Sequence, residues 1–249
     1  FQGYLEESLV RKARDKGVPL IALKVGRSAE AQSATISHTA SLAGGDAGAQ
    51  ALLDRLGIAR VNDLPTFLET LKLLHAVGPL PSGKIASISC SGGEASLAAD
   101  TAHGRALEFP PLKPGQNDAL FAALGPKVAL ANPLDYHTYI WRDTPAMTAA
   151  FSAMIDPDLA LTFLIVDFPR ADRCDPADWE CTIQAALGTR AATGGNVAMV
   201  TTLPELLPED VSERLMAGGV VPMHGLTEAF GAAEAAVVRS TPDLDIDVL

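Results

Sequence analysis

The segment from Lys84 to Gly104, "KIASISCSGGEASLAADTAHG", decides how the fold of this 249-residue sequence is interpreted. An apolar run ends at Cys90, a Ser-Gly-Gly turn follows, and an alanine-rich stretch then ends in glycine. The apolar run predicts a buried strand, and the stretch after the turn predicts a helix. A strand that turns directly into a helix is typical of parallel sheets.

The same alternation of short apolar runs and helical stretches extends over most of the chain. It predicts right-handed crossovers and a doubly wound parallel sheet, and therefore the α/β class. The Pro- and Gly-rich stretch 78–83 predicts a domain boundary, and residues 105–157 are expected to form mainly loops. Further strands are predicted at 18–26, 158–169, 196–202 and 220–225, and further helices at 48–57, 64–78, 177–188, 208–219 and 226–238.

Composition excludes several classes of function. The formal net charge is -11 and no basic patch interrupts it, which argues against nucleic-acid binding. No apolar run is long enough to cross a bilayer. The three cysteines, Cys90, Cys174 and Cys181, lack metal-ligand spacing, so we expect reduced thiols in a cytoplasmic protein and no metal site. Residues Phe1–Gly3 match the end of a cleavable expression tag.

The turn at Ser91, Gly92 and Gly93 is a candidate phosphate-binding site. A helix that begins there presents free backbone N–H groups, and glycine lets an anion approach the backbone closely. An ordinary glycine-containing turn is the alternative. The turn lacks both the dinucleotide-binding fingerprint and the P-loop pattern.

His38 is the most distinctive of the five histidines, because its neighbours in "ATISHTASLAGGDAG" (residues 34–48) are all small or hydroxylic. These neighbours make His38 a candidate catalytic residue, whereas a lone loop histidine is more often simply exposed. A second candidate site is the stretch "NPLDYHTYIW" (residues 132–141), in which a proline-fixed loop carries Asp135, Tyr136 and His137. These three residues are candidates for an acyl site.

Six motifs follow one another along the chain: Tyr4-Leu5-Glu6, Lys24-Val25-Gly26-Arg27-Ser28, Ser37-His38-Thr39-Ala40-Ser41-Leu42-Ala43-Gly44, "SISCSGGEASLAAD" (87–100), "ANPLD" (131–135) and "LPEDVSERLMAGGVVPMHGLTEAFGAAEAAV" (207–237). Together and in this order they resemble the NDP-forming acyl-CoA synthetases, a family that includes the ADP-forming acetyl-CoA synthetases and is related to succinyl-CoA synthetase. Ala40 departs from the family pattern, which usually has glycine there.

The resemblance implies a role for particular residues. It makes His38 the residue that is phosphorylated and Glu6 the carboxylate that orients its ring. Ser37, Thr39 and Gly44 would then support the loop. The helix after Gly92 and Gly93 would help to hold the phosphoryl group.

The resemblance also implies the architecture of the protein. Two flavodoxin-like domains are expected, the first of them incomplete: residues 4–80 with the phosphohistidine loop, residues 81–239 as a ligase-CoA domain, and 240–249 as a tail or linker. A response-regulator-like flavodoxin fold is a further possibility, but no acidic cluster after a first strand supports it.

The implied activity is that of an acid–CoA ligase. It interconverts an organic acid, CoA and ATP with acyl-CoA, ADP and phosphate, through an acyl phosphate and a phosphohistidine; GDP is an alternative product. CoA-binding and ATP-grasp domains, the latter with Mg²⁺, are expected in the same chain or in a partner subunit, with homo-oligomerisation open and the isolated chain inactive. The alternative function is a non-catalytic anion-binding or scaffold module that kept the fold.

Overall fold

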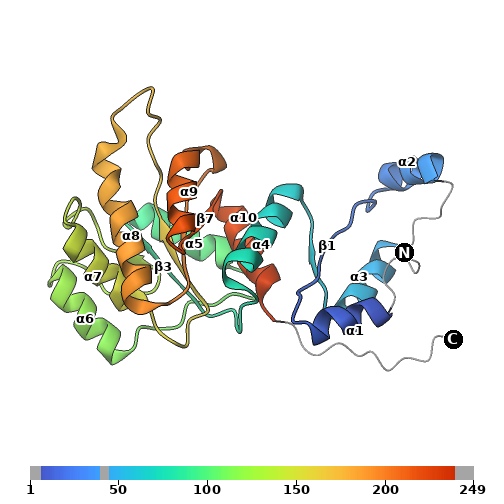
Figure 1. Cartoon of the computed structure of the whole chain (residues 1–249), viewed down its shortest axis with the longest axis horizontal. Helices are drawn as coiled ribbons and strands as arrows, with labels where there is room; N and C mark the ends of the chain where they lie inside the picture. Colours follow the sequence, from blue (N-terminus) through green and yellow to red (C-terminus); the bar gives the residue numbers. More distant parts are fainter. Residues whose placement is uncertain (1–6, 40–44, 239–249) are drawn as a thin grey trace. The chain divides into compact units, whose positions relative to one another are not determined.

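The computed structural model describes residues 7–39 and 45–238 (Figure 1). The chain divides into two compact units: the second spans Glu69–Val237, and the first takes in the chain up to Leu68 together with the part from Val238 onward. This division falls inside helix α4 (Leu64–Val77), whereas the sequence places the domain boundary after residue 80. The domain ranges 4–80, 81–239 and 240–249 therefore stay predictions.

The second unit is built on a five-stranded sheet in which every pair of neighbours is parallel, in the order β4-β3-β5-β6-β7. The predicted α/β class with parallel sheets is confirmed. At the edges lie β4, which has only two residues, and β7, which contains Pro222. The strands are β3 (Ile85–Ser89), β4 (Leu134–Asp135), β5 (Leu161–Ile165), β6 (Val197–Val200) and β7 (Val221–Met223).

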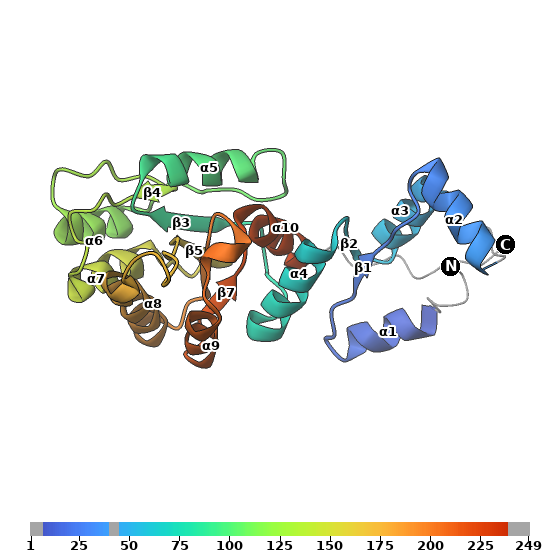
Figure 2. The ribbon, with the colours of Figure 1, turned by 90° about the horizontal axis from the view of Figure 1, so that it is seen from above.

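Helices cover both faces of this sheet, because its central strands are apolar on both sides. Every residue of β3 and β5 is buried. Figure 2 shows α5 on one side of β3 and α7 and α8 on the other. One core cluster joins the sheet to α6, α7, α8 and α9, and the other joins it to α4, α5 and α10. The helices are α5 (Gly92–Ala102), α6 (Pro114–Leu124), α7 (Thr144–Met154), α8 (Glu180–Thr193), α9 (Glu209–Ala217) and α10 (Leu226–Ala236), with short 3₁₀ turns at Pro176–Trp179 and Pro204–Leu206.

The expectation of loops over residues 105–157 is wrong, because this region contains α6, β4 and α7. The starts of the two helices are capped locally. Asp143 Oδ1 accepts a hydrogen bond from Ala146 N at 3.0 Å, and Gln116 Oε1 accepts one from Lys113 N at 3.0 Å. Side-chain acceptors of this kind satisfy N–H groups that have no partner within the helix.

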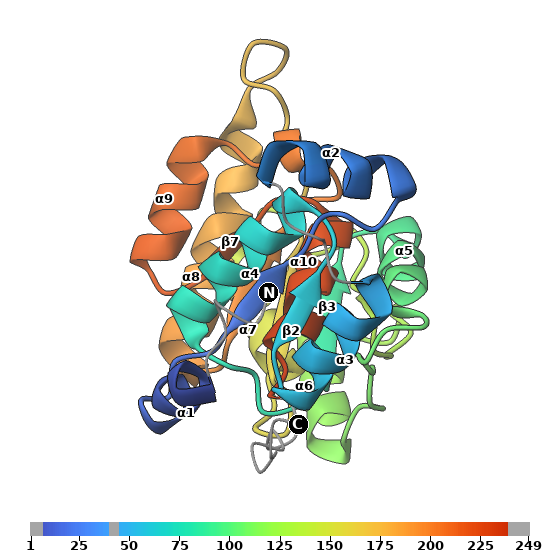
Figure 3. The same cartoon turned by 90° about the vertical axis from the view of Figure 1, so that its right-hand side faces the viewer.

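The first unit holds a two-stranded parallel sheet of β1 (Ile21–Leu23) and β2 (Ala59–Val61), with Ile21 opposite Ala59. Helix α3 packs against β2 (Figure 3). A small apolar core in this unit is formed by Val10, Leu53, Leu56 and Ile58, and Ala22 of β1 packs against it. The helices of this unit are α1 (Glu7–Asp15), α2 (Ala29–Thr39) and α3 (Asp46–Arg55), followed by the beginning of α4.

Helix α2 replaces much of the loop expected after β1. Ser28 Oγ accepts a hydrogen bond from Ala31 N at 3.1 Å and Ser28 O accepts one from Gln32 N at 3.0 Å, so this serine starts the helix. The alanines that follow favour helix over extended backbone. None of the helices described over 7–39 and 45–238 is long and apolar enough to cross a membrane.

Candidate functional site

The carboxyl ends of the parallel strands in the second unit meet at one edge of the sheet, and the predicted phosphate-binding turn lies there. Ser91 caps α5 and its Oγ accepts a hydrogen bond from Glu94 N at 3.2 Å. Gly92 and Gly93 form the first two helical positions and are exposed. Within the described parts of the chain, no acceptor is bonded to their N–H groups, which are therefore available to an anion.

Asp135 lies beside this turn. It ends β4 in register with Ser89, and its Oδ2 would lie 3.3 Å from a Cβ built on Gly92. A Cβ on Gly93 would instead meet only Ser91 Oγ, at 3.7 Å. The two glycines therefore differ: the space beside Gly92 is shared with a carboxylate, and the space beside Gly93 is open.

The other two candidate acyl-site residues have different environments. Tyr136 is 2% exposed and packs edge to face on Phe151, with ring centroids 5.7 Å apart, so its ring belongs to the core. His137 is exposed, and its backbone N–H donates to Asp135 Oδ1 at 2.8 Å. The structure thus separates Tyr136 from the exposed edge that Asp135 and His137 share. An acyl-binding role for these residues stays a prediction.

Two further carboxylates, which the sequence reasoning missed, gather at the same edge. Burial raises the pKa of Glu94, and the negative charge of Asp167 raises it further. Asp167 is held by Thr202, whose N and Oγ1 donate to its two carboxylate oxygens at 2.7 and 2.6 Å. Burial, followed by the charge of Glu94, also raises the pKa of the Cys90 thiol to about 11. The available signal was position, since Asp167 follows a buried strand directly after Val166.

This environment limits what the turn can bind. A phosphoryl dianion at Gly92 and Gly93 would gain two N–H donors but would be repelled by the carboxylates of Glu94, Asp135 and Asp167. Protonation of Glu94 removes one of these charges, and the raised pKa of this group favours that form.

Across the described ranges, no cluster of three or more His, Cys, Asp or Glu residues could hold a metal ion.

The structure gives little on the predicted catalytic residues, His38 and Glu6, because only the backbone of His38 is described and Glu6 is not. Ser37, His38 and Thr39 form the last turn of α2 by their backbone, and their side chains are not described. Glu6 and Gly44 lie outside the described residues altogether. The roles assigned to these five residues stay predictions.

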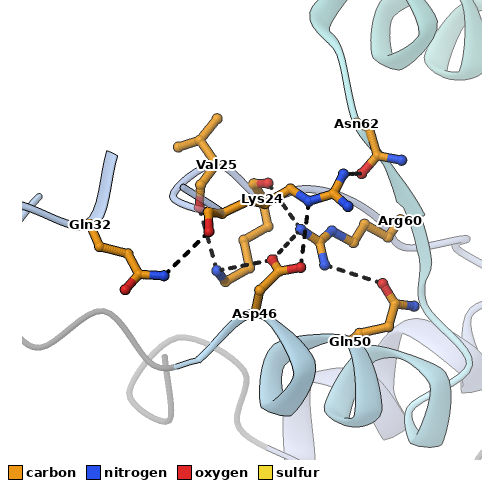
Figure 4. A network of polar contacts seen from close by, with 8 residues as sticks. Lys24, Val25, Gln32, Asp46, Gln50, Arg60 and Asn62 are labelled. Atoms are coloured by element: carbon orange, nitrogen blue, oxygen red, sulfur yellow. Dashed lines mark hydrogen bonds and ion pairs between the residues drawn. The ribbon is translucent and has the colours of Figure 1, made fainter. Parts of the chain in front are cut away.

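A network of polar contacts surrounds Asp46 in the first unit (Figure 4). Its members Lys24 and Asn62 directly follow β1 and β2. Asp46, the first residue of α3, accepts a hydrogen bond from Arg60 Nη2 at 2.6 Å. Its carboxylate oxygens also lie 3.5 Å from Arg27 Nε and 3.8 Å from Lys24 Nζ. The hydrogen bond from Arg60, helped by the three positive charges, lowers the pKa of Asp46. One carboxylate thus forms ion pairs with three cations.

Comparison with known proteins supports the resemblance carried by the motifs. Residues 7–74 match the family model of the succinyl-CoA ligase like flavodoxin domain. The chain is 26% identical over 236 residues to the alpha subunit of acetate–CoA ligase [ADP-forming] II from Pyrococcus furiosus, covering 94% of this chain and 50% of the relative. It is 35% identical over 129 residues to acetate–CoA ligase [ADP-forming] from Methanocaldococcus jannaschii, covering 51% of this chain and 18% of the relative.

Solved structures share the fold. The dinucleotide forming acetyl-coenzyme A synthetase 1 of Ca. Korarchaeum cryptofilum, solved in complex with phosphate and ADP, superposes with a TM-score of 0.73 at 17% identity. That match covers 92% of this chain and 48% of the other. The chain therefore spans about half the length, or less, of the relatives it matches. The recognised resemblance to the NDP-forming acyl-CoA synthetases is confirmed.

Proposed function

From its relationship to the NDP-forming acyl-CoA synthetases, we propose that this chain supplies the phosphohistidine segment and the ligase-CoA domain of an acid–CoA ligase. The observation that carries the proposal is the position of His38. It lies inside the stretch 7–74 that matches the succinyl-CoA ligase like flavodoxin domain, and it is flanked by the Ser37 and Thr39 of the family motif.

In the proposed reaction, phosphate first displaces CoA from an acyl-CoA to give an acyl phosphate. A ring nitrogen of neutral His38 then attacks the phosphorus, so that an N–P bond forms while the P–O bond to the acyl group breaks, and the carboxylate leaves with the electron pair. The terminal phosphate oxygen of ADP finally attacks the same phosphorus, which breaks the N–P bond and yields ATP. The whole sequence is reversible.

His38 needs a partner for its second ring nitrogen, because the proton there fixes the tautomer and positive charge develops on the ring during attack. We assign this part to Glu6, whose carboxylate would accept that N–H. Ser37, Thr39 and Gly44 would shape the segment around the ring.

The Gly92–Gly93 turn would help to hold the phosphoryl group. A helix N-terminus contributes only about 0.3–1 kcal/mol toward an anion, or ~2 when partly buried. The turn therefore works only together with further donors. Asp135, at the end of β4, and the neighbouring His137 are the residues we propose nearest the acyl end of the small organic acid.

The proposed ligase also needs domains that bind CoA and the nucleotide. A CoA-binding domain and an ATP-grasp domain, in the same chain or in a partner subunit, would bind CoA and ATP or ADP, and Mg²⁺ would accompany the nucleotide. The chain by itself is then expected to be inactive in the complete reaction.

The test uses the assembled ligase and γ-labelled ATP. We expect a phosphoryl adduct on the chain that is labile in acid and stable in base. His38→Asn should abolish it, whereas His75→Asn, which alters an exposed histidine in the last turn of α4, should leave it intact. An adduct that survives His38→Asn would refute the assignment, and a wild-type protein without any adduct would favour the non-catalytic module.

A further inference from the structure

The network around Asp46 holds more positive charge than its one carboxylate can balance. Lys24, Arg27 and Arg60 all form ion pairs with Asp46, and within the described residues no other carboxylate pairs with them. Three cations against one anion leave an excess of two positive charges. The whole chain carries a formal charge of -11, so this local excess runs against its composition.

This excess of positive charge is energetically costly because two of the three cations are buried. The side chains of Lys24 and Arg60 are only 8% and 5% exposed. A buried cation without a counter-charge is costly, and neutral acceptors do not replace the missing charge. The remaining acceptors are neutral: Gln50 Oε1 for Arg60, Asn62 Oδ1 for Arg27, and backbone carbonyls.

The hydrogen-bonding capacity of the network is also unfilled. Arg60 Nε is buried and bonds to no acceptor in the described parts of the chain. In the described parts of the chain, Lys24 Nζ donates one long hydrogen bond, to Val25 O at 3.4 Å. Arg27 is 61% exposed and Asp46 29%, so a ligand can reach the network from solvent on the side of these two residues.

We propose that Lys24, Arg27 and Arg60 form a binding site for a phosphoryl dianion, with Asp46 holding the three cations together when the site is empty. Two negative charges match the excess of two positive charges. Guanidinium and ammonium groups are common donors to phosphate oxygens in proteins, and together they offer both fixed and adaptable hydrogen bonds.

The dianion has two conceivable sources, free inorganic phosphate and a phosphoryl group carried by His38. The network adjoins the first turn of α2, because Arg27 precedes this helix by two residues and Gln32 Nε2 donates to Arg27 O at 3.4 Å. His38 lies in the last turn of the same helix, so the second source requires the histidine segment to change its position. The second source rests on the proposed function, whereas the first does not.

The site is tested with inorganic phosphate on the 249-residue chain, by thermal melting and isothermal titration calorimetry against chloride at equal ionic strength. We expect phosphate to raise the melting temperature more than chloride does. Arg27→Gln, at an exposed side chain that should leave folding intact, is expected to weaken phosphate binding about tenfold. The control is Arg55→Gln, which removes the same charge from an exposed position on α3 and should bind phosphate as the wild type does.

Asp46→Asn should make the stability of the chain depend more strongly on phosphate. This variant should melt lower in chloride, because the three cations lose their carboxylate, and phosphate should restore more of the loss than chloride does. An ion-pair network with a purely structural role would show no such rescue. Equal effects of phosphate and chloride on the wild type and on Asp46→Asn would overturn the proposal, and so would equal losses in Arg27→Gln and Arg55→Gln.

His38→Asn separates the two sources. Retained phosphate binding in this variant shows that the site takes free phosphate and stands whatever the fate of the proposed function. If the site instead serves the phosphoryl group on His38, Arg27→Gln in the assembled ligase should shorten the lifetime of the adduct while Arg55→Gln does not. Loss of the adduct in His38→Asn with unchanged phosphate binding would support both proposals independently.

Discussion

The substitution Gly93→Ala should separate the role of the α5 turn in phosphoryl transfer from its role in folding. Gly93 occupies the second helical position, and a Cβ there meets only Ser91 Oγ at 3.7 Å, which is an ordinary van der Waals contact. Alanine favours helix over glycine by up to about 1 kcal/mol. The variant should therefore fold and melt at or slightly above the wild-type temperature.

Its effect on function should be much larger. The added methyl group would occupy space through which a phosphoryl oxygen reaches the exposed N–H groups of the turn. A hydrogen bond to a charged group contributes about 1.5–3 kcal/mol, so the loss of one such bond in the transition state should slow phosphorylation of His38 roughly 10- to 100-fold. Rapid-quench measurement of the labelled adduct in the assembled ligase gives this rate.

The chain offers a closely matched control in Gly115→Ala. Gly115 also occupies the second helical position of its helix, α6, and a Cβ there meets nothing within 4 Å. It should change the melting temperature as Gly93→Ala does and leave the rate of phosphorylation unchanged. A Gly93→Ala enzyme that phosphorylates His38 at the wild-type rate would refute the role of this turn.

Three further predictions concern the second unit. Glu94→Gln should raise the free energy of unfolding at pH 7 and lose this advantage near pH 4. The raised pKa of Glu94 means that folding favours its protonated form, so the stability of the wild type falls as the pH rises above 4.5, the ordinary pKa of a glutamate. Urea unfolding at several pH values checks this, with the exposed Glu213→Gln as control. Phe230→Ala should lower the free energy of unfolding by about 3–5 kcal/mol, because this fully buried ring stacks on Phe163 with the ring centroids 4.7 Å apart. The melting temperature should fall by roughly 10 °C, whereas Phe121→Ala, at a 55% exposed side chain, should change it little. Asp135→Asn should alter turnover or the preference among organic acids, and Tyr136→Phe, inside the core, should not; unchanged kinetics in Asp135→Asn would remove this loop from the site.

The parts of the fold that could be predicted are those where burial dictates composition. The residues of β3, β5 and β6 are buried, so each strand is a run of apolar and small side chains that can be recognised without further context. The helix after Ser91 could also be predicted from the sequence, because an N-cap serine and two glycines mark its start.

The parts that could not be predicted lack that signal. Helix α6 begins with Pro-Gly and continues with Gln, Asn and Asp, residue types that are also common in turns. Helix α7 is a mixture of alanine, threonine and methionine without a clear polar face, although Asp143 before Thr144-Pro145 was a usable start signal. Strands β2 and β4, with three and two residues, are too short for any period to emerge.

The candidate sites divide in the same way. The position of Ser91, Gly92 and Gly93 at the edge of the sheet follows from the order of strand, turn and helix. The approach of Asp135 to Gly92, and the gathering of Lys24, Arg27 and Arg60 around Asp46, depend on which strands become neighbours. Strand order is a tertiary property that the local pattern of residues does not encode.

The two edge strands of the large sheet bear on how the protein behaves at high concentration. An exposed edge can recruit a strand from another molecule and start aggregation. Here β4 offers only two residues for such pairing. The three residues of β7 are buried, and Pro222 among them has no N–H to donate. We therefore expect concentrated solutions to resist cross-β assembly, and replacing Pro222 by valine, which restores a donor and a strand-favouring side chain, should raise thioflavin-positive aggregation on prolonged incubation.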